Sequence, residues 1–212
     1  MNAHLEQRVL TWGPPSAPVV VLAVHGRGHQ PEAMRELTGR FGPLPARFTA
    51  PAAAGSSWYP LPFLQPLAAN QPHLDEALAA TEARIDTLLA TGTALGDVVL
   101  LGFSQGACLL AHLLLTRPRR IGAAVLLTGG FIGPDPIEPP TGDELDGVPV
   151  LLRSISEDPW VPAGRVLETA HLFEEAGART DVEIEPGGEH IVTDKACHAA
   201  GELIRSLPHP VR

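Results

Sequence analysis

The sequence predicts an α/β fold in which a mostly parallel sheet carries helices on both faces. Short apolar runs alternate along the chain with segments of helical periodicity, and repeated strand–helix alternation builds parallel sheets. The 21 glycines and 22 prolines lie mostly between the apolar runs, as expected of loops that join many short elements. No internal repeat is visible in the 212 residues, so we expect residues 1–212 to form one domain with a substantial core.

The predicted strands are short runs of aliphatic and β-branched residues. Val19–Val24 reads VVVLAV without a polar residue, which is typical of a strand that is buried on both faces. Pro51 ends the short run that follows the first helix. In chain order we expect strands at Val19–Val24, Arg47–Ala50, Val98–Leu101, Ile121–Leu127, Val148–Ile155 and Thr180–Ile184.

The predicted helices follow from proline positions and from apolar faces. Pro31 stands where a first helical turn tolerates proline. The longest helical segment places Leu74, Leu78, Ile85 and Leu89 on one face. We expect helices at Pro31–Arg40, Pro72–Ala90, Gln105–Thr116, Pro162–Ala176 and His190–Ser206.

Two long connections stand out between these elements. Pro51–Gln71 is rich in proline and aromatic residues, and clustered aromatic residues in so long a loop indicate a functional rather than a disordered segment. Gly129–Gly147 is expected to cross the surface, and the sequence leaves open whether it forms a lid.

Composition excludes several classes of partner. With a formal net charge of -9 and no run of Lys and Arg, the chain has no electrostatic reason to bind nucleic acid or an anionic membrane. No apolar stretch approaches the roughly 20 residues that span a bilayer. Cys108 and Cys197 lack metal-type spacing and fit a reducing compartment. Met1–Leu10 lacks the order of a signal peptide. We expect a cytoplasmic protein without stable membrane association, and a homodimer is one of the open assembly states.

The strongest chemical signal is Gly102-Phe103-Ser104-Gln105-Gly106, which fits G-x-S-x-G. A predicted strand precedes it and a predicted helix follows, which is the context of the nucleophile turn in α/β-hydrolases. The alternative is an ordinary glycine-rich turn. The agreement of strand, turn and helix favours Ser104 as a nucleophile beside a helix N-terminus.

Serine needs a base, and the hydrolase fold requires the chain order serine, acid, histidine. His190 follows Gly187-Gly188-Glu189, directly after the last predicted strand, where a loop reaches the edge of the sheet. A capping or solvent-facing role is the alternative for this residue. The other histidines precede the serine or lie in predicted helices or in the tail, and they are His4, His25, His29, His73, His112, His171, His198 and His209.

The acid is expected after an earlier strand, where it orients the imidazole. Asp158 and Glu157 both follow Val148–Ile155. Asp158 opens Asp-Pro-Trp-Val-Pro, whose prolines stiffen the loop, and a short side chain on a stiff loop is the better orienting group. Glu157 is then a solvated neighbour, and Asp135 in the proline-rich loop is a weaker alternative.

Two backbone amides are expected to form an oxyanion hole. One belongs to Gln105, the residue after the nucleophile, and the second to Arg27 in the loop after Val19–Val24. His25 and His29 in the same loop are four residues apart, but intervening glycines disfavour a helix and no carboxylate or cysteine stands nearby. We therefore predict no metal site.

These motifs resemble the phospholipase/carboxylesterase family of α/β-hydrolases, which includes acyl-protein thioesterases. The matching pieces span most of the chain and are His25-Gly26-Arg27-Gly28, Gly102 to Ala107, Ser156 to Pro162, Gly188-Glu189-His190 and a block from Trp58 to Pro72 that resembles a bacterial subgroup of small esterases. The resemblance implies an α/β-hydrolase with little or no cap domain, no cofactor, and Ser104, Asp158 and His190 as a triad. Arg27 stands where the family often has an apolar residue, which favours an anionic or polar substrate group.

Three functions follow, in order of preference. The first is cleavage of small or short-chain carboxylic esters through an acyl-enzyme on Ser104, with a rate that falls below about pH 6–7 as the base is protonated. The second is a thioesterase or lysophospholipase with the same triad, and the third a non-catalytic binding protein with this fold. Candidates for the pocket wall are Trp58, Tyr59, Phe63, Phe131 and Trp160.

Overall fold

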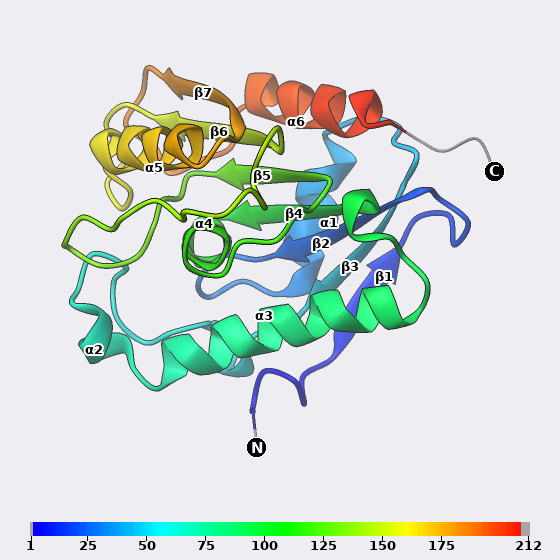
Figure 1. Ribbon diagram of the computed structural model, residues 1–212, viewed down its shortest axis with the longest axis horizontal. Coiled ribbons are helices and arrows are strands. Elements are labelled where there is room, and N and C mark those ends of the chain that lie inside the picture. The colour runs from blue at the N-terminus through cyan, green and yellow to red at the C-terminus, as the bar shows by residue number, and fades with distance from the viewer. Residues whose placement is uncertain (1, 209–212) are drawn as a thin grey trace.

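The computed structural model describes residues 2–208 and has one seven-stranded sheet in the order β1-β3-β2-β4-β5-β6-β7 (Figure 1). β1 pairs antiparallel with β3, and all other neighbours pair in parallel. The strands are β1 (Val9–Trp12), β2 (Val19–Val24), β3 (Ala46–Pro51), β4 (Val98–Phe103), β5 (Ala123–Leu127), β6 (Pro149–Ile155) and β7 (Arg179–Glu185). This mostly parallel sheet with its helices confirms the predicted α/β-hydrolase fold.

Helices cover both faces of the sheet (Figure 1). α1 (Pro31–Gly39) and α6 (Asp194–Ser206) pack on one face, whereas α3 (His73–Ala90), α4 (Gln105–Thr116) and α5 (Ala163–Glu175) pack on the other. The remaining elements are α2 (Leu67–Asn70) and single 3₁₀ turns at Ala54–Ser56 and Leu95–Asp97. Among residues 2–208 no helix is long and apolar enough to cross a membrane.

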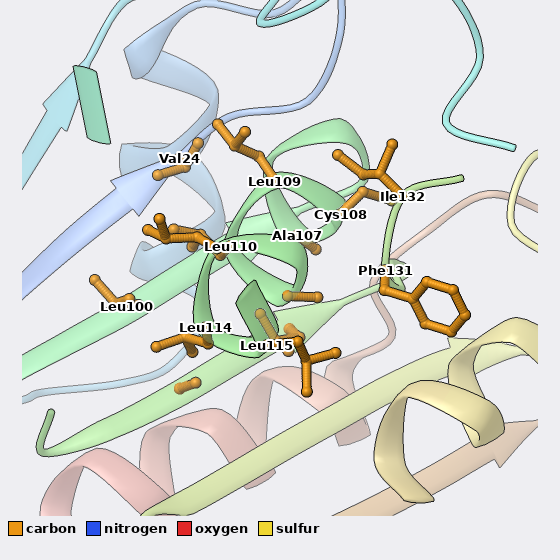
Figure 2. Packing of buried hydrophobic residues seen from close by; sticks show 14 of the residues in the cluster. Val24, Leu100, Ala107, Cys108, Leu109, Leu110, Leu114, Leu115, Phe131 and Ile132 are labelled. Atoms are coloured by element: carbon orange, nitrogen blue, oxygen red, sulfur yellow. The ribbon is translucent and has the colours of Figure 1, made fainter. Parts of the chain in front are cut away.

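The core explains why the central strands read as unbroken apolar runs. In β2, Val21 and Ala23 face α1 and α6, whereas Leu22 and Val24 face α3 and α4. α4 is buried on all sides from Gln105 to Leu115, and Figure 2 shows its leucines among Val24, Leu100 and Phe131. A helix enclosed in this way cannot shift, so the residue at its N-terminus has a fixed position.

Most predicted elements agree with the structure to within a few residues, and Val19–Val24 and Gln105–Thr116 agree at both ends. The last helix was expected from His190 but begins at Asp194. It starts there because the Thr193 hydroxyl accepts the Ala196 amide proton at 3.0 Å and caps the helix. β1 was not predicted, since its four residues VLTW form a half-exposed edge strand with little periodic signal.

The segment Gly129–Gly147 only partly follows the expectation of a surface crossing. Gly129–Gly133 is buried, with Phe131 and Ile132 in the core. Arg165 of α5 holds it there, because its guanidinium donates to the carbonyl oxygens of Phe131 and Gly133 and lies 3.9 Å from the Phe131 ring centroid. Residues 134–136 and 141–143 are exposed.

Candidate active site

Ser104 occupies a strained turn between β4 and α4. Its backbone has φ 54° and ψ -120°, a conformation that non-glycine residues rarely adopt. The turn closes only because its flanking residues lack side chains. A Cβ on Gly102 would stand 2.5 Å from the Ala107 Cα, and one on Gly106 would stand 2.1 Å from the Val24 carbonyl oxygen. The two glycines of the motif are therefore steric requirements of this turn.

A chain of hydrogen bonds joins Ser104, His190 and Asp158. The Ser104 Oγ lies 2.8 Å from the His190 Nε2, and the His190 Nδ1 lies 2.7 Å from the Asp158 Oδ2. The three residues follow β4, β6 and β7, so they meet at the carboxyl end of the sheet. An ionised carboxylate accepts only, so the imidazole carries its proton on Nδ1 and turns the Nε2 lone pair to the hydroxyl.

The second carboxylate oxygen of Asp158 organises its own loop. Its Oδ1 accepts the backbone amides of Trp160 at 2.8 Å and Val161 at 2.9 Å. The Asp158 side chain is fully buried, with 0% exposure, whereas Glu157 and Asp135 are exposed. Both oxygens of Asp158 thus have donors, and neither alternative acid reaches the imidazole.

The loop that carries His190 is anchored on both sides. The Glu157 amide donates to the Gly187 carbonyl oxygen at 2.9 Å, and the Thr193 hydroxyl donates to Glu185 Oε1 at 2.5 Å. The ring of Phe103 lies 5.3 Å from the His190 ring, centroid to centroid. These contacts hold the imidazole between the acid loop and the nucleophile turn.

The loop after β2 packs against the nucleophile turn. A Cβ on Gly26 would lie 3.2 Å from the Ser104 Cβ, and one on Gly106 would lie 2.7 Å from the His25 carbonyl oxygen. Within residues 2–208, the backbone amides of Arg27 and Gln105 donate no hydrogen bond to another protein group. The oxyanion hole expected from these two amides stays a prediction, and neither amide is engaged by a described protein group.

His25 has a structural place in this loop. It is fully buried, its Nε2 accepts the Ala53 amide at 3.0 Å, and its Nδ1 lies 2.8 Å from the Gly26 carbonyl oxygen. Burial lowers the pKa of His25, so the neutral ring serves as one donor and one acceptor. No group of three or more metal-ligating side chains occurs in the part of the chain that the structure describes.

The structure bears on two expectations about side chains near the site. The Arg27 guanidinium, which was expected to favour an anionic or polar substrate group, donates to the carbonyl oxygens of Pro60 at 2.6 Å and Leu61 at 2.8 Å, and its effect on the substrate stays a prediction. Three of the five side chains that were expected to line the pocket lie in the core instead: Trp58, Tyr59 and Phe131 are each 2% exposed. The prediction failed because a long loop that packs into the core is as rich in apolar residues as a pocket wall, and the sequence does not distinguish the two.

Of the remaining wall candidates, Phe63 is 7% exposed and Trp160 is 70% exposed. Trp160 lies two residues after Asp158 and presents a large aromatic surface at the acid loop. The sequence did not predict the tethers made by the side chains of Arg27 and Gln105, since their partners are loop carbonyl and amide groups without a sequence signal.

Comparison with known proteins places this geometry in context. The sequence model of the phospholipase/carboxylesterase family matches residues 7–207. A search of the curated proteins found no significant match. Among solved structures, the chain is similar to a phospholipase/carboxylesterase from Dyadobacter fermentans, with a TM-score of 0.86 and 30% identity over 96% of this chain and 98% of that one.

More distant structures share the fold. SOBER1 from Arabidopsis thaliana has a TM-score of 0.73 and 22% identity over 88% of this chain and 97% of that one. The carboxylesterase from Bacillus cereus has a TM-score of 0.73 and 18% identity over 94% of this chain and 93% of that one.

Proposed function

This chain belongs to the phospholipase/carboxylesterase family, and we propose that it cleaves carboxylic esters of small or short-chain substrates through an acyl-enzyme on Ser104. The observation that carries the proposal is the unbroken chain of hydrogen bonds from Ser104 Oγ through His190 to the buried Asp158. Serine is a weak nucleophile without a base, and His190 is that base, held in the required tautomer by Asp158.

In the first half of the reaction, the His190 Nε2 accepts the hydroxyl proton of Ser104 while Oγ bonds to the ester carbonyl carbon. The carbonyl oxygen becomes an oxyanion and accepts hydrogen bonds from the free amides of Arg27 and Gln105. The imidazolium then returns the proton to the leaving oxygen, the carbon–oxygen bond breaks, and the alcohol departs. Asp158 stabilises the imidazolium during this step.

In the second half, water replaces the alcohol. His190 accepts a proton from the water as its oxygen attacks the acyl carbon, and the same two amides hold the second oxyanion. Collapse of this intermediate breaks the bond to Ser104 Oγ and returns the proton to it, which releases the carboxylic acid. Asp158 and His190 finish in their starting protonation states.

The surroundings of the site support a small substrate. Trp160 offers an exposed aromatic surface next to the acid loop, whereas the Trp58 and Tyr59 side chains are buried in the core. The buried thiols of Cys108 and Cys197 are unpaired, which fits a reducing compartment, and we propose a cytoplasmic location.

The test is turnover of a short-chain nitrophenyl ester by the wild type and by Ser104→Ala. We expect kcat to fall by at least about 10³-fold, because the residual rate then depends on the oxyanion hole and on binding alone. A fluorophosphonate probe should label the wild type and spare the variant. Ser206→Ala, which alters an exposed serine at the end of α6, is the control and should keep wild-type activity and labelling.

Retained turnover in Ser104→Ala would remove the proposed nucleophile. A panel of nitrophenyl esters, acyl thioesters and lysolipids then ranks the substrate classes by kcat/KM. The proposal expects the short-chain esters to rank first, and a preference for a thioester or a lysolipid would move the function to the related alternative with the same triad.

A further inference from the structure

The two amides that would stabilise the oxyanion belong to residues whose own side chains hold the same short backbone segment. We call Ser57–Leu61 the support segment. We propose that the support segment sets the positions of both oxyanion amides, with the Gln105 carboxamide and the Arg27 guanidinium as positioning groups. The proposal rests on the proposed function, because it concerns the same reaction, but it adds two side chains that the triad mechanism does not use.

The Gln105 carboxamide is attached to the support segment at both of its ends. Its Oε1 accepts the Trp58 amide proton at 3.0 Å, and its Nε2 donates to the Tyr59 carbonyl oxygen at 2.8 Å. The Ser57 hydroxyl lies within hydrogen-bond distance of both ends and also donates to Tyr59. Gln105 is 6% exposed, so no water competes effectively for these groups. The carboxamide therefore has one orientation, and its backbone amide is held with it.

The Arg27 guanidinium forms hydrogen bonds with the other end of the support segment. Nη1 donates to the Pro60 carbonyl oxygen at 2.6 Å and Nη2 to the Leu61 carbonyl oxygen at 2.8 Å. Two nitrogens of one planar fork on consecutive carbonyls fix direction as well as distance. A backbone hydrogen bond lies just before the support segment, where the Gly28 amide donates to the Ser56 carbonyl oxygen at 2.7 Å.

Hydrogen bonds to two other parts of the molecule hold the support segment itself in place. Trp58 is buried and its indole Nε1 donates to the His25 carbonyl oxygen at 2.8 Å. The Leu61 amide donates to the Oδ1 of the buried Asn70 at 2.8 Å. The segment thus touches the loop after β2 and the start of α4, which carry one oxyanion amide each.

This arrangement has a kinetic consequence. Oxyanion donors act at about 2.7–3.1 Å from the oxygen of the tetrahedral intermediate, and that charge develops only after the substrate has bound. A small displacement of the amides should lower kcat and leave substrate binding nearly intact. A side chain that merely stabilises the fold would not separate the two parameters in this way.

The experiment compares Gln105→Ala and Arg27→Ala with the wild type. Both variants keep the backbone amide, so only its support is lost. We expect kcat to fall about 10- to 100-fold, less than for removal of a whole donor, with KM within about 3-fold. The inhibition constant of a trifluoromethyl ketone, which binds as an oxyanion adduct on Ser104, should rise by the same factor as kcat falls.

Two further variants sharpen the test. Arg27→Lys keeps the charge but loses the planar fork, so it should behave more like Arg27→Ala than like the wild type. The double variant of Gln105 and Arg27 should lose less than the product of the single losses, because both act through one segment. Arg205→Ala is the matched control: this arginine also donates to two loop carbonyls, of Phe41 and Pro43, away from the site, and its loss should leave kcat unchanged.

The outcomes separate this inference from the proposed function. If Ser104→Ala is inactive while folded Arg27→Ala and Gln105→Ala keep the wild-type kcat and ketone inhibition, the inference fails and the proposed function stands. If Ser104→Ala keeps its activity, the proposed function fails. Thermal unfolding verifies that the variants are folded, and Arg27→Ala decides alone if Gln105→Ala is unstable, because the Arg27 side chain lies at the surface.

Discussion

The two halves of the candidate site are held in place by different kinds of contact. The nucleophile half consists of the loop after β2 and the turn after β4, where glycine lets backbone segments touch: a Cβ on Gly26 or Gly106 would lie 3.2 Å from the Ser104 Cβ or 2.1 Å from the Val24 carbonyl oxygen. The acid–base half consists of the loops after β6 and β7, where side-chain hydrogen bonds join Asp158 and His190 to each other and to their loops.

The two kinds of contact should respond differently to substitutions. Steric contacts between backbone segments tolerate no added atom, so a side chain added at the glycines of the nucleophile half should act through loss of the fold. The hydrogen-bonded acid–base half accommodates an isosteric side chain, but a change of charge or of proton position disturbs the reaction. Such a substitution should therefore lower kcat while the fold persists. Two predictions test this division, and a third concerns the buried helix that begins at the nucleophile turn.

The largest effect is expected in the acid–base half, from Asp158→Asn. The amide oxygen can still accept from Trp160 and Val161, but the amide nitrogen would donate to the His190 Nδ1 and leave the proton on Nε2, facing Ser104. With the wrong tautomer, kcat should fall about 10⁴-fold, as for other serine triads, with little change in the unfolding midpoint. Steady-state turnover and thermal unfolding measure both quantities.

Glu157→Gln is the control for this change, since Glu157 is exposed beside Asp158 and should keep wild-type activity. An Asp158→Asn protein that retains a tenth or more of the wild-type kcat would show that Asp158 does not orient the base.

The next effect belongs to the nucleophile half, from Gly106→Ala. The new methyl group would stand 2.1 Å from the Val24 carbonyl oxygen, which is backbone and cannot turn aside. We expect the free energy of unfolding to drop by about 3 kcal/mol or more, with loss of activity following the loss of the fold. Urea denaturation gives the stability directly.

Gly164→Ala in α5 is the matched control, because among residues 2–208 no heavy atom beyond its chain neighbours and the nearby helix backbone lies within 4 Å of the position of its Cβ. Alanine favours a helix over glycine, so this variant should be more stable by up to about 1 kcal/mol. Equal stabilities of the two variants would contradict the steric explanation of the nucleophile turn.

The smallest effect at neutral pH concerns His112, which lies in α4, the helix that follows the nucleophile turn. Burial, reinforced by the charge of Arg117 and opposed by Asp75, lowers the pKa of His112 from 6.5 to about 4. The unfolded chain then binds a proton more readily than the folded one, so stability is full above about pH 6.5 and declines as the pH falls toward 4. This histidine accounts for a loss of about 3 kcal/mol at most.

His112→Leu should remove that part of the acid sensitivity and leave stability at pH 8 nearly unchanged, since the buried Nδ1 of His112 has no hydrogen-bond partner within residues 2–208. His4 and His25, whose pKa values burial also lowers, keep part of the slope. Urea denaturation between pH 4 and pH 8 measures the slope. An unaltered slope in His112→Leu would refute the assignment.

Much of the fold could be predicted because its signals are local. The run VVVLAV and the glycine turn around Ser104 contain within a few residues what decides their structure, and both are found where the sequence places them. The predicted start of α6 was wrong because His190 and Thr193 both fit a helix boundary. Only the contact of the Thr193 hydroxyl with the Ala196 amide decides between them.

By itself, the sequence determined the α/β architecture, the turn at Ser104 between a strand and a helix, and the chain order that singled out Asp158 and His190 as candidates. Only the tertiary structure decided that Trp58, Tyr59 and Phe131 are core, that the Arg27 guanidinium binds Pro60 and Leu61, and that Gln105 holds Ser57 to Tyr59. The physical reason is range: strands and turns follow from neighbouring residues, whereas these contacts join residues 33 to 48 positions apart, mostly through loop carbonyl and amide groups that every residue carries alike.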